Sequence, residues 1–494
     1  MFKKILIANR GEIAVRVIRA CREMSIDSVA VYSDVDRAAL AVLKADEAYR
    51  LGPSPAAESY LNIEKILEVA TRCGADAIHP GYGFLSENSK FAQACAHAGI
   101  KFIGPSAASM EMMGSKTRAR QTVDRSGIPF VPGTSRGLDS PEQAKEVAKK
   151  IGYPIMLKAA AGGGGKGMRL VASSSELKES LESARSEALR AFGSDEVYIE
   201  KAIINPRHIE MQILADEQGN IVYLGERECS LQRRHQKVLE ESPSPVVDPD
   251  LRRRMGEISV RVAKAAGYAN AGTIEFLVDE HKNFYFLEMN TRLQVEHPVT
   301  ELVTGLDLVQ LQIRIAAGEP LPFRQEDIRL RGHAIECRIY AEDPENNYFP
   351  SPGRITALHE PSGPGIRLDS GIYDGWNVPI DYDPLLAKLI AFATDRAQAT
   401  GRLLRAVEDY FVGGITTNLS LFRTILSDGD FQAGKFHTSY LDNLLKSKSS
   451  THGKETAIAA IAAGLFSALD PVPGKSQIDK SSGWKRIARS EALQ

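Results

Sequence analysis

The stretch from residue 288 to residue 297 constrains the fold of this chain more than any other, because polar and apolar side chains alternate along it. Successive side chains of an extended strand point to opposite faces of a sheet. An extended chain would therefore gather on one face the polar residues of the even positions, which are Glu288, Asn290, Arg292, Gln294 and Glu296. Carboxylates, amides and a guanidinium are an unusual lining for a sheet, and together they predict a binding site.

The residues before this stretch predict a β-hairpin that brings two carboxylates together. Residues 273–278 and 284–288 are typical of antiparallel strands around a polar turn, and symmetrical folding about that turn places Glu275 opposite Glu288. Both strands carry apolar residues on both faces, so we expect the pair to be at least half buried. Two facing buried carboxylates repel each other and lose hydration unless a cation lies between them.

Glu275, Glu288 and Asn290 therefore predict an all-oxygen site for a hard ion, Mg²⁺ held together with substrate phosphates. The alternative is a solvent-facing stripe with cross-strand ion pairs. The rest of the sequence has to decide between the two interpretations.

The composition is that of an ordinary globular protein of about three domains. The 494 residues carry a net charge of −2, so no overall basic field points to nucleic acid. The cysteines, five in number and without a Cys-x-x-Cys motif, indicate reduced thiols that serve as small core residues. The apolar start stops at Asn9-Arg10, too early for a signal peptide, and the apolar stretch 457–469 is shorter than the ~20 residues that span a bilayer. We expect a cytoplasmic protein that binds neither nucleic acid nor a membrane.

The N-terminal part of the chain alternates strands and helices. Residues 4–8, 28–33 and 75–78 are typical of strands, and residues 12–24 and 63–70 are typical of helices. This alternation predicts a parallel sheet. The motif Gly-x-Gly-x-x-Gly is absent from the first turn, which argues against a dinucleotide-binding dehydrogenase.

Short strands and Pro/Gly turns dominate the sequence beyond Gly332. Helices are predicted near residues 396–412 and 417–427. A polar linker over residues 446–454 then separates this region from two short helices predicted in residues 455–494.

A run of glycines, Gly162 to Gly165, follows a short strand over residues 155–158. Such a run lets backbone N–H groups approach phosphate oxygens without obstruction by Cβ atoms, and Lys158 and Lys166 add positive charge. It is not a Walker A loop, because no Gly-Lys-Ser/Thr opens a helix here. Two compatible interpretations stay open, a flexible turn between strands and a lid that closes over a nucleotide.

Together with other motifs, these residues give the chain a resemblance to the biotin carboxylases, ATP-grasp enzymes that perform the first half-reaction of biotin-dependent carboxylases. The resemblance extends over residues 1 to about 445 and rests on residues 3–14, 79–88, 162–167, 227–237 and 288–297. It implies a ligase that joins bicarbonate to the ureido nitrogen of biotin with ATP and Mg²⁺ or Mn²⁺.

The same resemblance implies an α/β architecture of several domains. A Rossmann-like N-terminal domain would occupy residues 1–114. An ATP-grasp domain would follow over residues 115–331, with a mobile glycine-rich lid at about residues 131–202. A C-terminal mixed α+β domain would occupy residues 332–446, and residues 447–494 would form a linker and helical tail.

The resemblance also implies roles for individual residues. ATP would be surrounded by Lys116, Lys158, Gly164, Gly165, Glu200, Lys201, Ile203, His208, Gln232, His235, Glu275 and Glu288. The metal would be held by Glu275, Glu288 and Asn290. Bicarbonate and biotin would be held by Lys237, Arg292, Gln294, Val295, Glu296 and Arg338.

Four of these residues, Lys237, Arg292, Glu296 and Arg338, would be catalytic. Bicarbonate is a poor nucleophile, so Glu296 would remove its proton while Lys237 and Arg292 hold its oxygens. The product, carboxyphosphate, would yield CO₂ and a phosphate that takes the N1′ proton of biotin. Arg338 would stabilise the enolate oxygen of biotin, to which a permanently charged guanidinium is well suited.

The implied partners are a biotin carboxyl carrier protein and carboxyltransferase subunits, since no Ala-Met-Lys-Met biotinylation motif is present. A homodimer is also expected. The run from Asp381 to Lys388 is similar to acyl-CoA and pyruvate carboxylases, so the acceptor is expected to be acetyl- or propionyl-CoA, with pyruvate as the alternative. Two further hypotheses are a different ATP-grasp ligase and an inactive scaffold. One departure from the family is Ala202, where an aromatic residue is expected, and it predicts a packing change.

Overall fold

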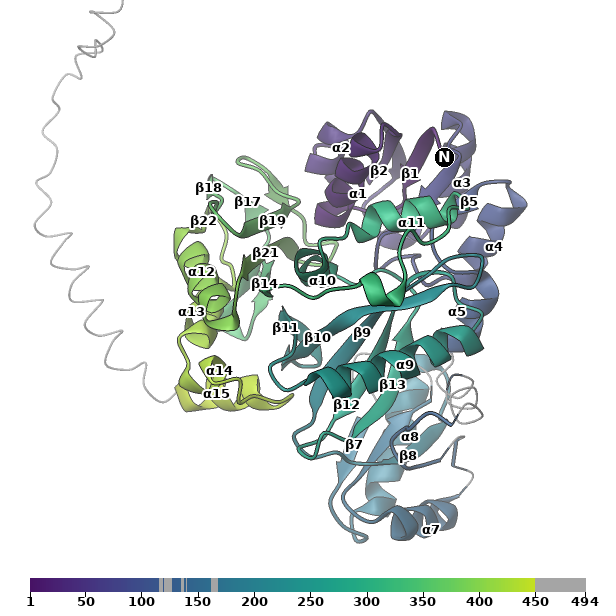
Figure 1. The fold of residues 1–494 in the computed structure, drawn as a ribbon, viewed down its shortest axis with the longest axis vertical. Coiled ribbons are helices and arrows are strands. Elements are labelled where there is room, and N and C mark those ends of the chain that lie inside the picture. The colour runs from purple at the N-terminus through teal and green to yellow at the C-terminus, as the bar shows by residue number, and fades with distance from the viewer. Residues whose placement is uncertain (115–118, 120–126, 135–136, 139, 161–167, 449–494) are drawn as a thin grey trace, which may run out of the picture. The chain divides into compact units, whose positions relative to one another are not determined.

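The computed structural model describes residues 1–114, 119, 127–134, 137–138, 140–160 and 168–448 (Figure 1). Met1–Leu441 form one compact unit, and Asp442–Gln494 belong to a second. The predicted linker and tail of residues 447–494 lie almost wholly outside the described residues. Among the residues that are described, no helix has the length and apolar character needed to cross a membrane.

The N-terminal part forms the predicted parallel sheet, with strand order β3-β2-β1-β4-β5. Its strands are β1 (Lys4–Ile7), β2 (Asp27–Ser33), β3 (Glu47–Gly52), β4 (Ala77–His79) and β5 (Lys101–Phe102). The helices between and after them are α1 (Gly11–Glu23), α2 (Leu40–Lys44), α3 (Ile63–Cys73), α4 (Ser89–His97) and α5 (Ala107–Gly114). Asn62 and Asn88 cap α3 and α4 by accepting a backbone N–H bond in the first turn.

A small antiparallel sheet contains the strand that precedes the glycine run. Its order is β7-β6-β8, with β6 over Ile155–Ala159, β7 over Met168–Val171 and β8 over Val197–Lys201. The helices α7 (Pro141–Ile151) and α8 (Leu177–Phe192) pack on it through an apolar cluster of their own. The predicted strands around the glycines are therefore confirmed, whereas the glycines themselves lie outside the described residues.

The largest sheet has eight antiparallel strands in the order β13-β12-β9-β10-β11-β14-β21-β19. Its strands are β9 (Arg207–Ala215), β10 (Ile221–Arg233), β11 (Gln236–Ser242), β12 (Asn270–Val278), β13 (Phe284–Asn290), β14 (His333–Tyr340), β19 (Ile366–Ser370) and β21 (Leu385–Ala393). Helix α9 (Pro249–Ala265) packs across β9 and β10 (Figure 1). Because β11 pairs with β14, the sheet is continuous across the predicted domain boundary at residue 332. The predicted division into domains stays a prediction.

Helices and short strands complete the described C-terminal part. The helices are α10 (His297–Thr304), α11 (Leu308–Ala316), α12 (Arg396–Asp409), α13 (Leu419–Leu426), α14 (Gly429–Gln432) and α15 (Tyr440–Lys448). The short strands are β15 (Glu342–Asp343), β16 (Phe349–Pro350), β17 (Gly353–Arg354), β18 (Ala357–His359), β20 (Asn377–Val378) and β22 (Phe411–Gly413). The helices predicted near residues 396–412 and 417–427 are confirmed. All five cysteines are free and buried, as predicted.

The predicted hairpin is formed by β12 and β13, and it pairs Glu275 with Glu288 as the sequence predicted. Its pairing is less regular than a symmetrical fold, because the register shifts between Glu275 and Phe276. A β-bulge of this kind re-aims side chains at one edge of a strand pair.

The prediction of an extended chain throughout residues 288–296 is wrong for residues 291–296, because β13 ends at Asn290. The backbone N–H of Thr291 donates to Glu87 Oε1 over 2.9 Å instead of entering the sheet. Glu296 has a non-extended backbone (φ −80°, ψ 13°) and occupies the N-cap position of α10, where its side chain makes no capping hydrogen bond. The polar residues of this stretch still meet, but a loop rather than a strand face brings them together.

Candidate active site

Lys237 on β11 lies at the centre of a buried charge cluster. Its Nζ atom is 2.6 Å from Glu210 Oε2, 2.8 Å from Glu275 Oε1 and 2.7 Å from Glu296 Oε1. An ammonium has three N–H donors, so each of them meets a different carboxylate. We call Lys237, Glu210, Glu275 and Glu296 the Lys237 cluster.

The sheet register explains why these residues meet. Glu210 on β9 is the direct cross-strand neighbour of Glu275 on β12, and Lys237 on β11 is opposite Gln232 on β10. Glu296 enters from outside the sheet, at the start of α10. The cluster therefore joins three strands and one helix terminus.

Burial and charge together set the protonation states in the Lys237 cluster. Burial opposes a charge on Lys237, but the three carboxylates outweigh it and raise the pKa of the ammonium well above 10.5. Burial also opposes a charge on Glu296, yet Lys237, Arg338 and Arg227 lower the pKa of this carboxyl well below 4.5. Glu275 follows the same logic, and Lys237 and His208 lower its pKa. The lysine and both glutamates are therefore charged at neutral pH.

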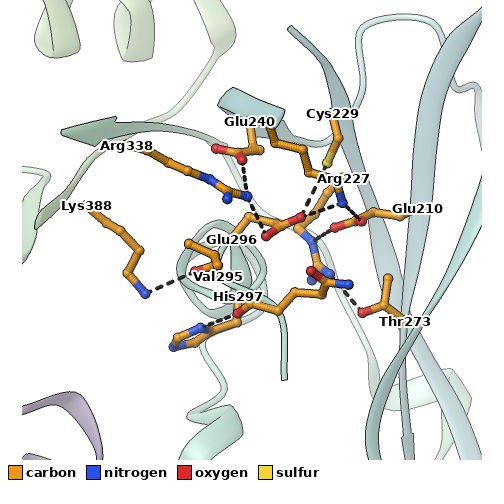
Figure 2. Close-up of polar contacts among 12 residues, drawn as sticks. Glu210, Arg227, Cys229, Glu240, Thr273, Val295, Glu296, His297, Arg338 and Lys388 are labelled. Carbon is orange, nitrogen blue, oxygen red and sulfur yellow. Dashed lines mark hydrogen bonds and ion pairs between the residues drawn. The ribbon is translucent and has the colours of Figure 1, made fainter. Parts of the chain in front are cut away.

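Arg338 on β14 approaches Glu296 from one side, and Glu210 on β9 lies on the opposite side (Figure 2). Its Nη2 atom is 2.9 Å from Glu296 Oε2 and 2.5 Å from Glu240 Oε1. Burial raises the pKa of Glu240 to about 7, although Arg338 counteracts this effect. Two carboxylates therefore hold one guanidinium at the edge of the Lys237 cluster.

Arg227 on β10 is fully buried and contacts the Lys237 cluster through Glu210. It pairs with Glu210, and its Nη1 atom donates to Gln212 Oε1 over 2.6 Å. Its guanidinium also donates to Thr300 Oγ1 over 3.0 Å. A further bond, to Thr273 Oγ1, is also 3.0 Å long (Figure 2). These bonds satisfy a buried charge that would otherwise be costly, and they orient Glu210 towards Lys237.

Glu210 and Arg227 are not among the site residues predicted from the sequence. A signal for Glu210 was present, because His208, Glu210 and Gln212 alternate with apolar residues as the even positions of residues 288–296 do. Arg227 opens the stretch 227–237 that carries the family resemblance, but only the structure reveals its contacts.

Arg292 is held by a residue from the N-terminal part of the chain. Its Nε atom is 2.9 Å from Glu87 Oε2, and its guanidinium also lies 3.1 Å from Gln294 Oε1 and 3.4 Å from Asn290 Oδ1. Burial opposes a charge on Arg292, but Glu87 and Glu296 raise its pKa. Glu87 belongs to the stretch 79–88 that carries the family resemblance, but only the structure reveals this contact.

The predicted metal residues lie together at the end of the β12–β13 pair. Asn290 Nδ2 donates to Glu275 Oε1 over 2.9 Å, and Glu288 is opposite Glu275 in the register. His208 Nε2 lies 2.9 Å from Glu275 Oε2, and although burial opposes it, this carboxylate raises the pKa of His208 above 6.5. In this structure the positive charge beside Glu275 comes from Lys237 and His208. The donor set of two carboxylates and an amide oxygen fits a hard divalent ion.

The residues predicted to surround ATP divide into several groups. Lys158 Nζ lies 2.5 Å from Glu200 Oε2, and Gln232 Nε2 lies 2.8 Å from His208 Nδ1. Lys201 Nζ instead donates to the carbonyls of Gly152 and Tyr153, over 3.0 and 2.9 Å. Lys158 and His208 are therefore buried, and each has a polar partner. The Lys201 ammonium instead binds two carbonyls of a neighbouring loop.

The remaining residues predicted to bind ATP are less buried than these or lie outside the part of the chain that the structure describes. Ile203 is half-buried, and His235 is exposed on the β10–β11 turn with φ +65°. Lys116, Gly164 and Gly165 lie outside the described residues. Ala202 is buried, and its backbone N–H donates to the carbonyl of Pro154 over 3.1 Å.

Three family models match consecutive parts of the chain. Residues 1–110 match the N-terminal domain of biotin carboxylase, and residues 336–443 match its C-terminal domain. Residues 115–324 match the ATP-binding domain of the carbamoyl-phosphate synthase L chain.

Individual proteins are similar over nearly the whole chain. A biotin carboxylase of Halalkalibacterium halodurans is 54% identical over 448 residues, which cover 91% of this chain and 99% of the relative. A pyruvate carboxylase subunit of Methanothermobacter thermautotrophicus is 52% identical over 442 residues, which cover 90% of each chain. The solved biotin carboxylase domain dimer of Hydrogenobacter thermophilus 2-oxoglutarate carboxylase, in complex with MgADP, ADP and bicarbonate, is 49% identical with a TM-score of 0.86, and the match covers 90% of this chain and 99% of that one.

Proposed function

The chain belongs to the biotin carboxylase family, and from this premise we propose that bicarbonate is activated at the Lys237 cluster and that biotin is carboxylated beside Arg338. The enzyme is an ATP-grasp ligase that carboxylates biotin with ATP and Mg²⁺. One observation carries the proposal for the site. The Glu296 carboxylate lies between two cations, 2.7 Å from Lys237 Nζ and 2.9 Å from Arg338 Nη2.

The first step needs a base beside positively charged groups. Glu296 is ionised and can take the proton of bicarbonate, while Lys237 and Arg292 hold the bicarbonate oxygens. A bicarbonate oxygen then attacks the γ-phosphorus of ATP, the bond from this phosphorus to ADP breaks, and carboxyphosphate and ADP form. Lys158 and His208 would offset charge on the phosphates.

Glu275, Glu288 and Asn290 are the residues that we expect to hold Mg²⁺. The β12–β13 register supports this assignment, because it sets the two carboxylates opposite each other with Asn290 at the end of the same strand. When bound, the ion neutralises charge on the phosphate oxygens. Its approach to Glu275 would compete with the contacts that Lys237 and His208 make in this structure.

The second step needs a cation beside the ureido oxygen of biotin. Carboxyphosphate breaks its carbon–oxygen bond to phosphate and gives CO₂. The phosphate then takes the N1′ proton, and the new bond forms between N1′ and CO₂. Arg338 would stabilise the negative charge that develops on the ureido oxygen, and Glu240 and Glu296 already orient its guanidinium.

Bicarbonate-dependent ATP cleavage tests this function. We expect the purified chain with Mg²⁺ to release ADP only when bicarbonate is present, and to do so faster when free biotin is added. A different ATP-grasp ligase would respond to another acceptor, and an inactive scaffold would release no ADP under any of these conditions. ADP release that ignores bicarbonate would contradict the proposal.

Replacing Glu288 by glutamine should lower kcat about 100-fold, on the scale of losing one preorganised electrostatic contact. The reason is that the metal site loses one unit of negative charge while its shape is kept. Steady-state ADP release at saturating bicarbonate and several Mg²⁺ concentrations measures the effect. Glu280→Gln is a matched control, because Glu280 lies in the turn of the same hairpin with its side chain 87% exposed. A Glu288→Gln kcat within about threefold of the parent would remove Glu288 from the metal site.

We further propose that the carboxyl group passes to acetyl- or propionyl-CoA through carrier and carboxyltransferase subunits on separate chains, with pyruvate as the alternative. The run from Asp381 to Lys388, which is similar to acyl-CoA and pyruvate carboxylases alike, is compatible with either acceptor. The similarity to a pyruvate carboxylase of Methanothermobacter thermautotrophicus supports the second. Purification of the chain from its native cell, with identification of the biotinylated and carboxyltransferase partners, tests this. A carboxyltransferase that accepts pyruvate alone would contradict the acyl-CoA proposal.

We also propose that the chain is a homodimer, as the domain of 2-oxoglutarate carboxylase is in its solved structure. Analytical ultracentrifugation of the purified chain measures this directly. A monomer at micromolar concentration would contradict it.

A further inference from the structure

Glu336 is a fully buried acid that lies next to the site and that the proposed chemistry does not use. It lies on β14, and the register makes it the direct cross-strand neighbour of Glu240 on β11. The side chains of such a pair project from the same face of the sheet, with Cβ atoms about 4.5–5.5 Å apart. Glu240 is fully buried too. Two acids therefore lie side by side, away from solvent.

The two acids differ in their partners. Glu240 Oε1 lies 2.5 Å from Arg338 Nη2, and Arg338 follows Glu336 by two positions on the same strand. Glu336 itself forms no ion pair in the part of the chain that the structure describes, and neither of its carboxyl oxygens has a hydrogen-bond partner there. The neighbouring cation on β21, Lys388, is engaged by Glu12, with Nζ 3.2 Å from Oε1.

An ionised carboxylate that is buried without a partner is costly, so a carboxyl group in this position keeps its proton. Burial raises the pKa of Glu336 well above 4.5, although Lys388 counteracts this effect. The negative charge of Glu240 raises it further. Because Glu240 has Arg338 beside it, the ionised form is favoured there, and the proton stays on Glu336. A protonated carboxyl group has one O–H donor, and the Glu240 carboxylate is placed to accept it.

The other titratable groups around the pair do not change this assignment. From β10, β11, β14, β21 and the start of α10, the groups that face the pair are Cys229, Lys237, Arg338, Tyr340, Lys388 and Glu296. The thiol and the phenol are neutral, because burial raises the pKa of each. Lys237 is held by the three carboxylates of its cluster. The Glu296 carboxylate adds negative charge and so favours the proton on Glu336.

We propose that Glu336 is a positioning residue for Arg338, which acts as a neutral acid that donates its O–H to the Glu240 carboxylate. This bond holds Glu240 in the orientation that presents Arg338 to the ureido oxygen of biotin. Neutrality matters, because an ionised Glu336 would be a third carboxylate around one guanidinium, after Glu240 and Glu296. Three carboxylates would offset the positive charge that the second step needs. The inference rests on the proposed function and deepens it, because it concerns how the same site holds its cation.

The competing role for Glu336 is that of a side chain that only fills space between two strands. In that role a hydrogen-bond donor is not needed, so glutamine and leucine would replace Glu336 with equal effect on the reaction. A positioning role needs the donor, which glutamine keeps and leucine lacks. It also predicts that the loss falls on the step that uses Arg338.

The test compares Glu336→Leu with Glu336→Gln. Both variants remove the ionisable group, but only glutamine offers an N–H donor to Glu240. We expect Glu336→Leu to lower carboxybiotin formation about tenfold, on the scale of one hydrogen bond to a charged group, while ADP release stays within about threefold of the parent. Glu336→Gln should rescue carboxybiotin formation to within about threefold of the parent. ADP release by the same preparations reports whether the fold is intact.

Equal carboxybiotin formation by the two variants, or equal losses of both activities in Glu336→Leu, would overturn the inference. Should Glu336→Leu not fold, infrared spectroscopy of the parent and Glu336→Gln decides the matter. Their difference spectrum at neutral pH should contain the C=O stretching band of a protonated carboxylic acid, which shifts in D₂O. A carboxylate band in its place would overturn the inference. Failure of the proposed function would be seen separately, as ADP release by the parent enzyme that ignores bicarbonate.

Discussion

Replacing Glu296 by alanine should lower bicarbonate-dependent ATP cleavage by about 10³-fold, within the range of a lost general base. Glu296 is the carboxylate that lies between Lys237 and Arg338, and its pKa is well below 4.5 because these cations outweigh the effect of burial. Without it, bicarbonate keeps its proton and remains a poor nucleophile. The rate of ADP release is measured at saturating ATP and bicarbonate. Following it over several hours makes a rate about 10³-fold below that of the parent detectable.

The loss must be separated from damage to the fold. Lys237 retains Glu210 and Glu275, and Arg338 retains Glu240, so no cation of the site loses all its partners in Glu296→Ala. Glu319→Gln serves as the control for the loss of a carboxylate far from the site, because the Glu319 side chain is half-buried after α11 and pairs only loosely with Arg314, over 3.4 Å. ATP binding by Glu296→Ala should resemble that of the parent. A variant that binds ATP normally and still cleaves it at a tenth of the parent rate or faster would show that another group removes the proton.

Replacing Arg338 by glutamine should separate the two half-steps. We expect carboxybiotin formation to fall by about 10³-fold, while ATP cleavage stays within about tenfold of the parent. The physical reason is that a group which stabilises only the later transition state affects only the step that passes through it. Arg338 is placed for such a role, because its guanidinium lies on the far side of Glu296 from Lys237.

ADP release and biotin carboxylation are measured in parallel on the same preparation of Arg338→Gln. Arg331→Gln is the control, since Arg331 is exposed just before the same strand. Equal losses in both assays would mean that Arg338 chiefly positions bicarbonate. A second variant, Glu240→Gln, weakens the hold on the Arg338 guanidinium without removing it. It should lower the same activities as Arg338→Gln, each by a smaller factor.

The β12–β13 hairpin shows what local sequence can determine. The alternation of side chains and the polar turn were enough to predict that Glu275 faces Glu288, because both strands and their turn lie within one short segment. The same local rule failed beyond Asn290. There the backbone N–H of Thr291 donates to Glu87, so a contact from outside the segment ends the strand.

The parallel N-terminal sheet and the helices near residues 396–412 and 417–427 were predictable for the same reason, since periodicity is a property of each segment alone. The residue types proposed for catalysis were likewise visible from motifs, and the resemblance supplied their roles. What periodicity and motifs lacked was any information on pairing between segments. The pairing of β11 with β14, which continues one sheet past residue 332, is such a pairing between distant segments.

The sequence by itself therefore determined most of the secondary structure, the family and the residue types that the proposed chemistry needs. The tertiary structure alone decided which charges meet. Lys237 contacts three acids that lie 27, 38 and 59 positions away in the sequence, and Arg292 contacts Glu87 from 205 positions away. The pKa of Glu296 depends on such contacts, because electrostatic energy depends on distances in space and on burial, neither of which is encoded within any one segment.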